Sequence, residues 1–118
     1  MKSKLLSAYI EFLKFQREIA QANKINVFLN ATDICLLEEI ALHDAATDAL
    51  TVTGAMALSK IGSPATLHRH LAKLRRHGLV EVSSVQGDTR VKRLTLSAVS
   101  VKYFESLSDA MLKAVKTL

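Results

Sequence analysis

The sequence predicts a mainly α-helical domain with one small β-hairpin, and three observations support this. Apolar residues recur at spacings of three and four along most of the chain, as in amphipathic helices. The chain contains a single proline. β-branched residues are concentrated in one stretch, residues 79–96, around the predicted hairpin loop Gln86–Gly87–Asp88–Thr89. Since 118 residues can bury one core, we expect a single domain over residues 1–118.

The two ends of the chain are each predicted to form a long helix, over residues 3–22 and 98–116. The apolar face of the first helix is wider than packing against one neighbour requires, which indicates a second surface to bury, most simply a partner subunit. The predicted dimer interface comprises Leu5, Leu6, Tyr9, Ile10, Phe12 and Leu13 with Met111, Leu112 and Val115.

Capping residues mark the first two helices between these ends. Asn30 can cap a helix whose third position is Asp33, and this helix is predicted to run to about His43. Thr51 can cap a further helix of roughly ten residues, which Gly62 ends. Both signals lie in residues 30–97, the part expected to carry the recognition elements.

A third internal helix and the hairpin follow. Ser63 can cap a helix with Pro64 at its first position, and Gly78 is suited to ending that helix after His77. The hairpin comes next, and Ser97 caps the last helix. Two short helices joined by a glycine turn and followed by a hairpin have the order of a winged helix-turn-helix. The predicted fold is therefore this motif with N- and C-terminal dimerisation helices.

The charge of +5 is unevenly distributed along the chain. Residues 49–104 carry nine basic residues against two acidic ones, whereas residues 1–48 carry five against seven. No acid occurs between Ala49 and Val80. Because a surface that approaches polyphosphate gains by excluding carboxylates, this segment is predicted to bind nucleic acid.

The helix after Ser63 is the predicted recognition helix. With its leucines buried, Arg69 and Arg76 fall nearly opposite, and Lys73 is expected to share this outer face. Without acids, ion pairs within the helix cannot explain the charges, so nucleic-acid contact is favoured over a merely solvated face. Thr66 and Arg69 suit base edges, whereas later cations suit phosphates. The candidate contacts are Ser63, Ala65, Thr66, Arg69, His70, Lys73, Arg75 and Arg76.

The hairpin supplies a second set of cations. Arg90, Lys92 and Arg93 lie at its tip and on its returning strand, where they can reach a minor groove. Asp88 is expected to hold Arg90 in a salt bridge, so it is included among the DNA-binding residues.

Other site chemistries are not favoured. His68 and His70 point about 200° apart on a helix and cannot share a metal ion, so no metal or cofactor is expected. Cys35 lies in an apolar stretch and is expected to be a small buried side chain. No catalytic constellation or phosphate-binding glycine loop is present, so the protein is not expected to be an enzyme. Without a signal peptide or membrane span, a cytoplasmic location is expected.

The segment GSPATLHRHLAKLRRHGLVEV, followed by GDTRVKRLTLS, resembles the MarR family of winged-helix regulators. The resemblance covers about Leu29 to Leu112. It implies that Arg90 enters a minor groove and that Asp88 orients basic side chains. It also implies dimerisation through the terminal helices, although family members close with two C-terminal helices and this chain with one. Many members bind small effectors, and none is identified from this sequence.

The leading hypothesis is a homodimeric bacterial transcriptional regulator that binds double-stranded DNA in a sequence-specific manner. Its recognition helix would occupy the major groove and its wing the minor groove. The alternative is a winged-helix module for protein–protein assembly, whose basic face meets an acidic partner. An enzyme is the third and weakest hypothesis.

Overall fold

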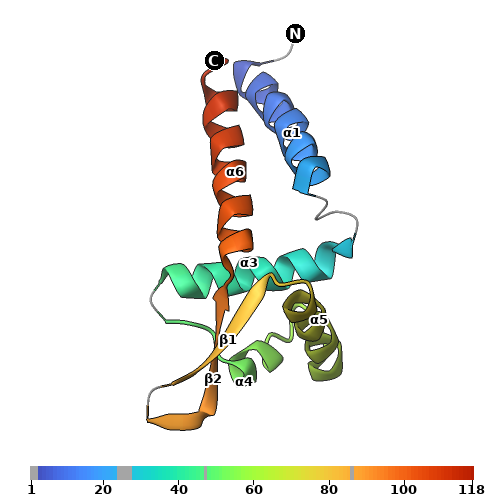
Figure 1. The fold of residues 1–118 in the computed structure, drawn as a ribbon. Helices are drawn as coiled ribbons and strands as arrows, with labels where there is room; N and C mark the ends of the chain where they lie inside the picture. The colour runs from blue at the N-terminus through green and yellow to red at the C-terminus, as the bar shows by residue number, and fades with distance from the viewer. Residues whose placement is uncertain (1–2, 24–27, 47, 86) are drawn as a thin grey trace. The chain divides into compact units, whose positions relative to one another are not determined.

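The structure is a computed structural model that describes residues 3–23, 28–46, 48–85 and 87–118. Within these residues Figure 1 shows helices and a two-stranded antiparallel hairpin. The mainly helical fold with one hairpin is therefore confirmed. In chain order the elements are α1 (Lys4–Asn23), α3 (Ala31–Ala45), α4 (Val52–Met56), α5 (Pro64–Arg76), β1 (Val80–Val85), β2 (Asp88–Leu96) and α6 (Ala98–Val115).

The chain divides into two compact units. Leu29–Ser100 forms a central unit, which holds α3, α4, α5 and the hairpin. Met1–Phe28 and Val101–Leu118 form a terminal unit, which holds α1 and most of α6. In the terminal unit the Lys113 ammonium lies 5.9 Å from the centroid of the Phe15 ring, so a cation–π contact joins its two helices.

A leucine-rich core holds the central unit together. α5 repeats leucine at intervals of four and three residues, which places these side chains on one face toward α3 and β1. α3 packs against both α5 and β2. The buried apolar side chains of this unit include Leu36, Leu37, Ile40, Leu67, Leu71, Leu74, Leu79 and Leu94.

The predicted caps of α3 and α4 are confirmed. Asn30 and Asp33 form a reciprocal capping box, in which each side chain accepts a hydrogen bond from the backbone N–H of the other residue. The Thr51 side chain accepts from the Gly54 N–H at 2.9 Å. The predicted length of α4 is wrong, because the α-helix spans 5 residues and not roughly ten. Beyond Met56 the N–H groups of Ala57, Leu58 and Ile61 donate to carbonyls three residues back, so α-helical hydrogen bonding is not propagated.

The hairpin is attached to the segment that precedes α4. Its register pairs Val80 with Leu96 and Val82 with Leu94, and an irregularity lies between Ser84 and Val85. The Leu94 N–H donates to the Leu50 carbonyl at 2.7 Å, so β2 is hydrogen-bonded to the residue just before the Thr51 cap. Residue 86 of the predicted hairpin loop lies outside the described residues. These bonds fix the hairpin beside α4.

The other helix ends also agree with the sequence. Gly78 has φ +72°, a left-handed conformation that glycine adopts without strain, and it follows the C-cap of α5. The Ser97 side chain accepts from the Ser100 N–H at 3.3 Å and so caps α6. The Ser100 hydroxyl donates to the Leu79 carbonyl at 2.6 Å, which joins the start of α6 to the residue before β1.

The burial expected for Cys35 is wrong, because its side chain is exposed. The buried residues of α3 are Asp33, Leu36, Leu37 and Ile40, which recur at helical spacing. Cys35 lies about 200° from Leu37 around the helix axis, on the opposite face. Within the described part of the chain, no helix has both the length and the hydropathy that crossing a bilayer requires.

We expect Leu74→Ala to lower the free energy of unfolding by about 2–5 kcal/mol, since it removes a fully buried side chain and leaves a cavity. Leu42→Ala is the matched control, because Leu42 is 65% exposed on α3 and its truncation should change stability by less than about 0.5 kcal/mol. Urea denaturation of both variants measures the difference. Equal losses in the two variants would contradict the core described above.

Candidate nucleic-acid interface

The N-terminus of α5 is set by Ser63 and Thr66. The Ser63 hydroxyl oxygen accepts from the Thr66 N–H at 3.3 Å, and the same hydroxyl donates to Thr66 Oγ1 at 3.0 Å. Pro64 occupies the first helical position, where a backbone N–H would have no acceptor within the helix, so its absence costs no hydrogen bond. Ser63 is exposed and Thr66 is half-buried, so both candidate contacts lie at the start of the helix with their hydroxyls joined to each other.

The exposed face of α5 combines small residues with cations and contains no acid. Arg69 and Arg76 are exposed opposite the buried leucines, as predicted. His68, which was not among the predicted contacts, is exposed on the same side as Arg75. The helical wheel could have revealed it, because positions 68 and 75 lie only about 20° apart. The exposed side chains of α5 after Pro64 are Ala65, His68, Arg69, Ala72, Arg75 and Arg76.

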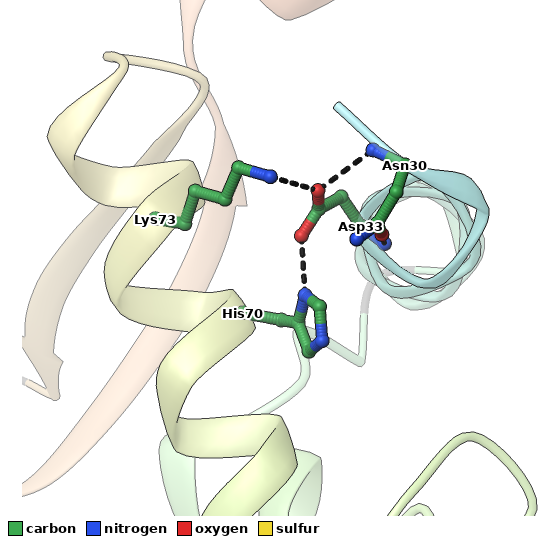
Figure 2. Close-up of polar contacts among 4 residues, drawn as sticks. All are labelled: Asn30, Asp33, His70 and Lys73. Carbon is green, nitrogen blue, oxygen red and sulfur yellow. Dashed lines mark hydrogen bonds and ion pairs between the residues drawn. The ribbon is translucent and has the colours of Figure 1, made fainter. Parts of the chain in front are cut away.

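His70 and Lys73 instead point toward the N-terminus of α3, where both contact Asp33 (Figure 2). His70 Nδ1 lies 2.5 Å from Asp33 Oδ1, and Lys73 Nζ donates to Oδ2 at 2.7 Å. The outer-face position expected for Lys73 is therefore corrected. Its side chain is 25% exposed and that of His70 is 14% exposed. Both residues lie on the flank of α5 that faces α3, between its buried and exposed faces.

Asp33 is a fully buried carboxylate with three hydrogen-bond donors in the described structure. Burial raises the pKa of Asp33, but the hydrogen bonds from Lys73, the Asn30 N–H and His70 outweigh it, together with the Lys73 charge. The pKa is therefore held below its ordinary value of 3.8, and the group is ionised at neutral pH. Since an ionised carboxylate can only accept, His70 Nδ1 carries the proton of their hydrogen bond.

The tip of the hairpin contains the predicted salt bridge between Asp88 and Arg90, which is confirmed. Arg90 donates to Asp88 Oδ1 from its backbone N–H at 3.0 Å and from Nε at 3.2 Å. These two bonds, the side-chain one being the larger effect, lower the pKa of Asp88. The Arg90 side chain is nevertheless 89% exposed, so the pair orients the guanidinium without burying it. Lys92 donates to Ser84 Oγ at 2.8 Å, and Arg93, the next residue along β2, is also exposed.

The predicted dimer residues include the most exposed apolar side chains of the terminal unit. Leu5 is 77% exposed and Leu112 is 62% exposed. Tyr9, Phe12, Met111 and Val115 help to line an entirely apolar hollow of about 370 Å³. Of the predicted interface, Leu5, Leu6, Tyr9, Met111, Leu112 and Val115 are exposed, whereas Ile10, Phe12 and Leu13 are half-buried.

No group of three or more His, Cys, Asp or Glu side chains suited to a metal ion occurs among the described residues. The cluster around Asp33 contains a lysine ammonium, which is a donor and not a ligand.

No protein-family model and no curated protein matches the chain, but solved structures do. MepR of S. aureus, in a complex with DNA, aligns with a TM-score of 0.66 at 19% identity over 86% of this chain and 73% of MepR. The transcriptional regulator Tm0710 of Thermotoga maritima aligns with a TM-score of 0.64 at 10% identity, over 89% of this chain and 70% of that one. ZitR of Lactococcus lactis aligns with a TM-score of 0.55 at 24% identity, over 75% of this chain and 57% of ZitR.

The chain has the winged-helix fold of MarR-family regulators. At these sequence identities the structural similarity establishes the fold. The resemblance to the MarR family that the sequence indicated is therefore confirmed for the fold. By its place in the chain order, α5 is the helix that the sequence predicts to be the recognition helix, and the β1–β2 hairpin is the predicted wing.

We expect Asp33→Asn to lower the free energy of unfolding at neutral pH by about 3 kcal/mol, because it leaves the partly buried Lys73 ammonium without a counter-charge and the His70 N–H without its carboxylate acceptor. The folded-state pKa of Asp33 lies below 3.8, so this stabilisation is complete above about pH 4. It is lost as the pH falls through the folded-state pKa. Denaturation from pH 7 to pH 2 should therefore show the wild type and the variant converging at the acid end. Glu38→Gln, which removes an exposed carboxylate from the same helix, is the control.

Proposed function

We propose that this protein is a transcriptional regulator that binds double-stranded DNA sequence-specifically as a homodimer. The observation that carries the proposal is the exposed face of α5, which presents three arginines and a histidine and contains no acid. This face lies in the same compact unit as a wing whose tip is basic. A cytoplasmic location accords with this function.

The proposed contacts divide according to what each side chain can reach. Ala65 and Ala72 allow the α5 backbone to approach the major groove, and Arg69 between them can bind a guanine edge with two hydrogen bonds. Arg75 and Arg76, further along α5, suit phosphates. Ser63, Thr66 and His68 complete the face of the helix that meets the DNA.

The wing is proposed to enter the adjacent minor groove. Arg90 is exposed and oriented by Asp88, so its guanidinium is available at low entropic cost. Lys92 and Arg93 follow on β2 and suit the flanking phosphates.

The DNA complexes of MepR support this function. There is a crystal structure of a MepR–DNA complex, and a mutant of MepR has been solved bound to an oligodeoxyribonucleotide. MepR has also been solved bound to ethidium bromide, so the same fold accommodates a small organic ligand in that protein. For the present chain a small-molecule effector stays a prediction without an identified site.

Homodimerisation is proposed through the terminal unit. Exposed leucines and an apolar hollow on one surface are costly to leave in water, and a second copy of the same surface would cover them. A dimer also places two recognition helices about one helical turn apart in successive major grooves, which predicts a two-fold symmetric operator.

Selection of bound sequences from a random duplex pool tests the function directly. A two-fold symmetric motif is expected, with an affinity that falls steeply as salt rises. The alternative function, a protein–protein module with an acidic partner, predicts that no duplex is enriched and that heparin or tRNA competes as well as any duplex. That result would reject sequence-specific regulation.

We expect Arg69→Ala to relax base preference at one operator position and to weaken specific binding by about 1–3 kcal/mol. Arg76→Ala should weaken binding to all sequences alike and flatten the slope of log affinity against log salt concentration by about one unit. Fluorescence anisotropy across a salt series, on the selected and a scrambled duplex, measures both effects. Arg17→Ala, an exposed arginine of α1, controls for the loss of one charge. If Arg69→Ala and Arg76→Ala change binding to the two duplexes in the same way, Arg69 contacts phosphates and not a base edge.

We expect the wild type to sediment as a dimer at micromolar concentration and Leu112→Glu to sediment as a monomer. The substitution places a charge on an apolar surface that the dimer would bury. Val99→Glu is the matched control, since Val99 is similarly exposed, at 60%, on the same helix but outside the predicted interface. A wild type that sediments as a monomer would remove the dimer from the proposal.

A further inference from the structure

We infer that Asp33 is a positioning residue for DNA reading, which fixes the rotation of α5 through His70 and Lys73. The inference rests on the proposed function and deepens it, because it names a group that contacts no DNA and yet determines specificity. The juxtaposition in Figure 2 carries it: one buried carboxylate receives two side chains from a single turn of the recognition helix.

The geometry attaches α5 at two points. His70 and Lys73 are three residues apart, so they leave the helix about one turn apart along its axis. They donate to different oxygens of Asp33, and the Asn30 N–H holds Oδ2 from the other side at 2.8 Å. The capping box in turn fixes Asp33 to the first turn of α3. The carboxylate therefore cannot turn without breaking at least one of these bonds.

The leucine core alone does not provide this constraint. Contacts of Leu67, Leu71 and Leu74 are non-directional, so a small rotation of α5 could be absorbed by repacking. A rotation of about 20° moves a side chain at the helix surface by about 2 Å, given a helix radius of 5–6 Å with side chains. Such a shift is enough to break a bidentate contact to a base edge. Directional hydrogen bonds to Asp33 are the feature that resists it.

Chain connectivity strengthens the inference. Arg69 immediately precedes His70, and Ala72 immediately precedes Lys73. The residues proposed to face the groove thus alternate with those that bind Asp33 along the same turn of α5. Any movement of the Asp33 contacts is transmitted directly to the proposed base-reading side chain.

Simple electrostatics and positioning predict opposite results for the same variant. Asp33→Asn removes a negative charge near DNA and releases the Lys73 ammonium, so electrostatics alone predicts tighter binding to every duplex. Positioning predicts weaker binding to the operator and little change on random DNA, because phosphate contacts tolerate a rotation that base contacts do not.

The test compares Asp33→Asn, His70→Ala, Lys73→Met and the control Glu38→Gln by anisotropy, on the selected duplex and on a scrambled duplex. Circular dichroism establishes a temperature at which each variant is folded. We expect Asp33→Asn to lose about 10- to 100-fold in affinity for the selected duplex, as when one base contact is lost, and less than about 3-fold for the scrambled one. Glu38→Gln should change neither.

Two further measurements separate positioning from a general loss of structure. His70→Asn, which places an amide donor near the position of Nδ1, should restore much of the specificity that His70→Ala loses. The double variant Asp33→Asn with His70→Ala should lose no more affinity for the selected duplex than Asp33→Asn alone, since both substitutions remove the same contact.

Lys73→Met keeps the inference testable if Asp33→Asn does not fold. If Lys73 has a positioning role, Lys73→Met should lose affinity only for the selected duplex, and the salt dependence of binding should not change. If Lys73 contacts a phosphate, the variant should lose affinity equally for both duplexes, and the salt slope should be flatter by about one unit. The inference is overturned if Asp33→Asn binds the selected duplex as tightly as the wild type, or if either variant loses equally on both duplexes. A wild type that discriminates between no duplexes overturns the proposed function as well.

Discussion

The packing of α5 against α3 and β1 is the interaction on which the rest of the central unit depends. It buries the leucine face of α5, and a helix of 13 residues with one buried face must expose the opposite one. The exposed face is where Arg69 and Arg76 lie. The same packing brings the flank of α5 against the capped end of α3, which is the only reason that Asp33 and Lys73, 40 residues apart, can form an ion pair.

Two acids accompany the cations of the candidate interface, and their surroundings give them different effects. Asp88 is two residues from Arg90 and holds a guanidinium that remains in water, so the pair contributes orientation and little stability. Asp33 is buried and joins α3 to α5, so its loss leaves the partly buried Lys73 ammonium without a counter-charge. One acid thus orients a single side chain, and the other constrains a helix.

Local signals in the sequence predicted most of the fold, because helix caps depend on residues only a few positions apart. The caps at Asn30, Thr51 and Ser63 and the turn at Gly78 follow from side-chain chemistry within one turn. The length of α4 did not follow, since hydrophobic spacing does not distinguish an α-helix from successive three-residue turns over a few residues. Cys35 was misplaced because an apolar run does not by itself say which face is buried.

The site was harder to predict than the fold because its decisive contact is long-range. A helical wheel divides α5 into buried and exposed faces, and this correctly placed Arg69 and Arg76. It cannot say which neighbour covers the boundary between the faces, where His70 and Lys73 lie. A capping aspartate has a further oxygen lone pair to offer after its cap is made, and a cation at such a boundary can reach it. Basic residues at the edge of a recognition helix therefore cannot be counted as phosphate contacts until the caps of neighbouring helices are considered.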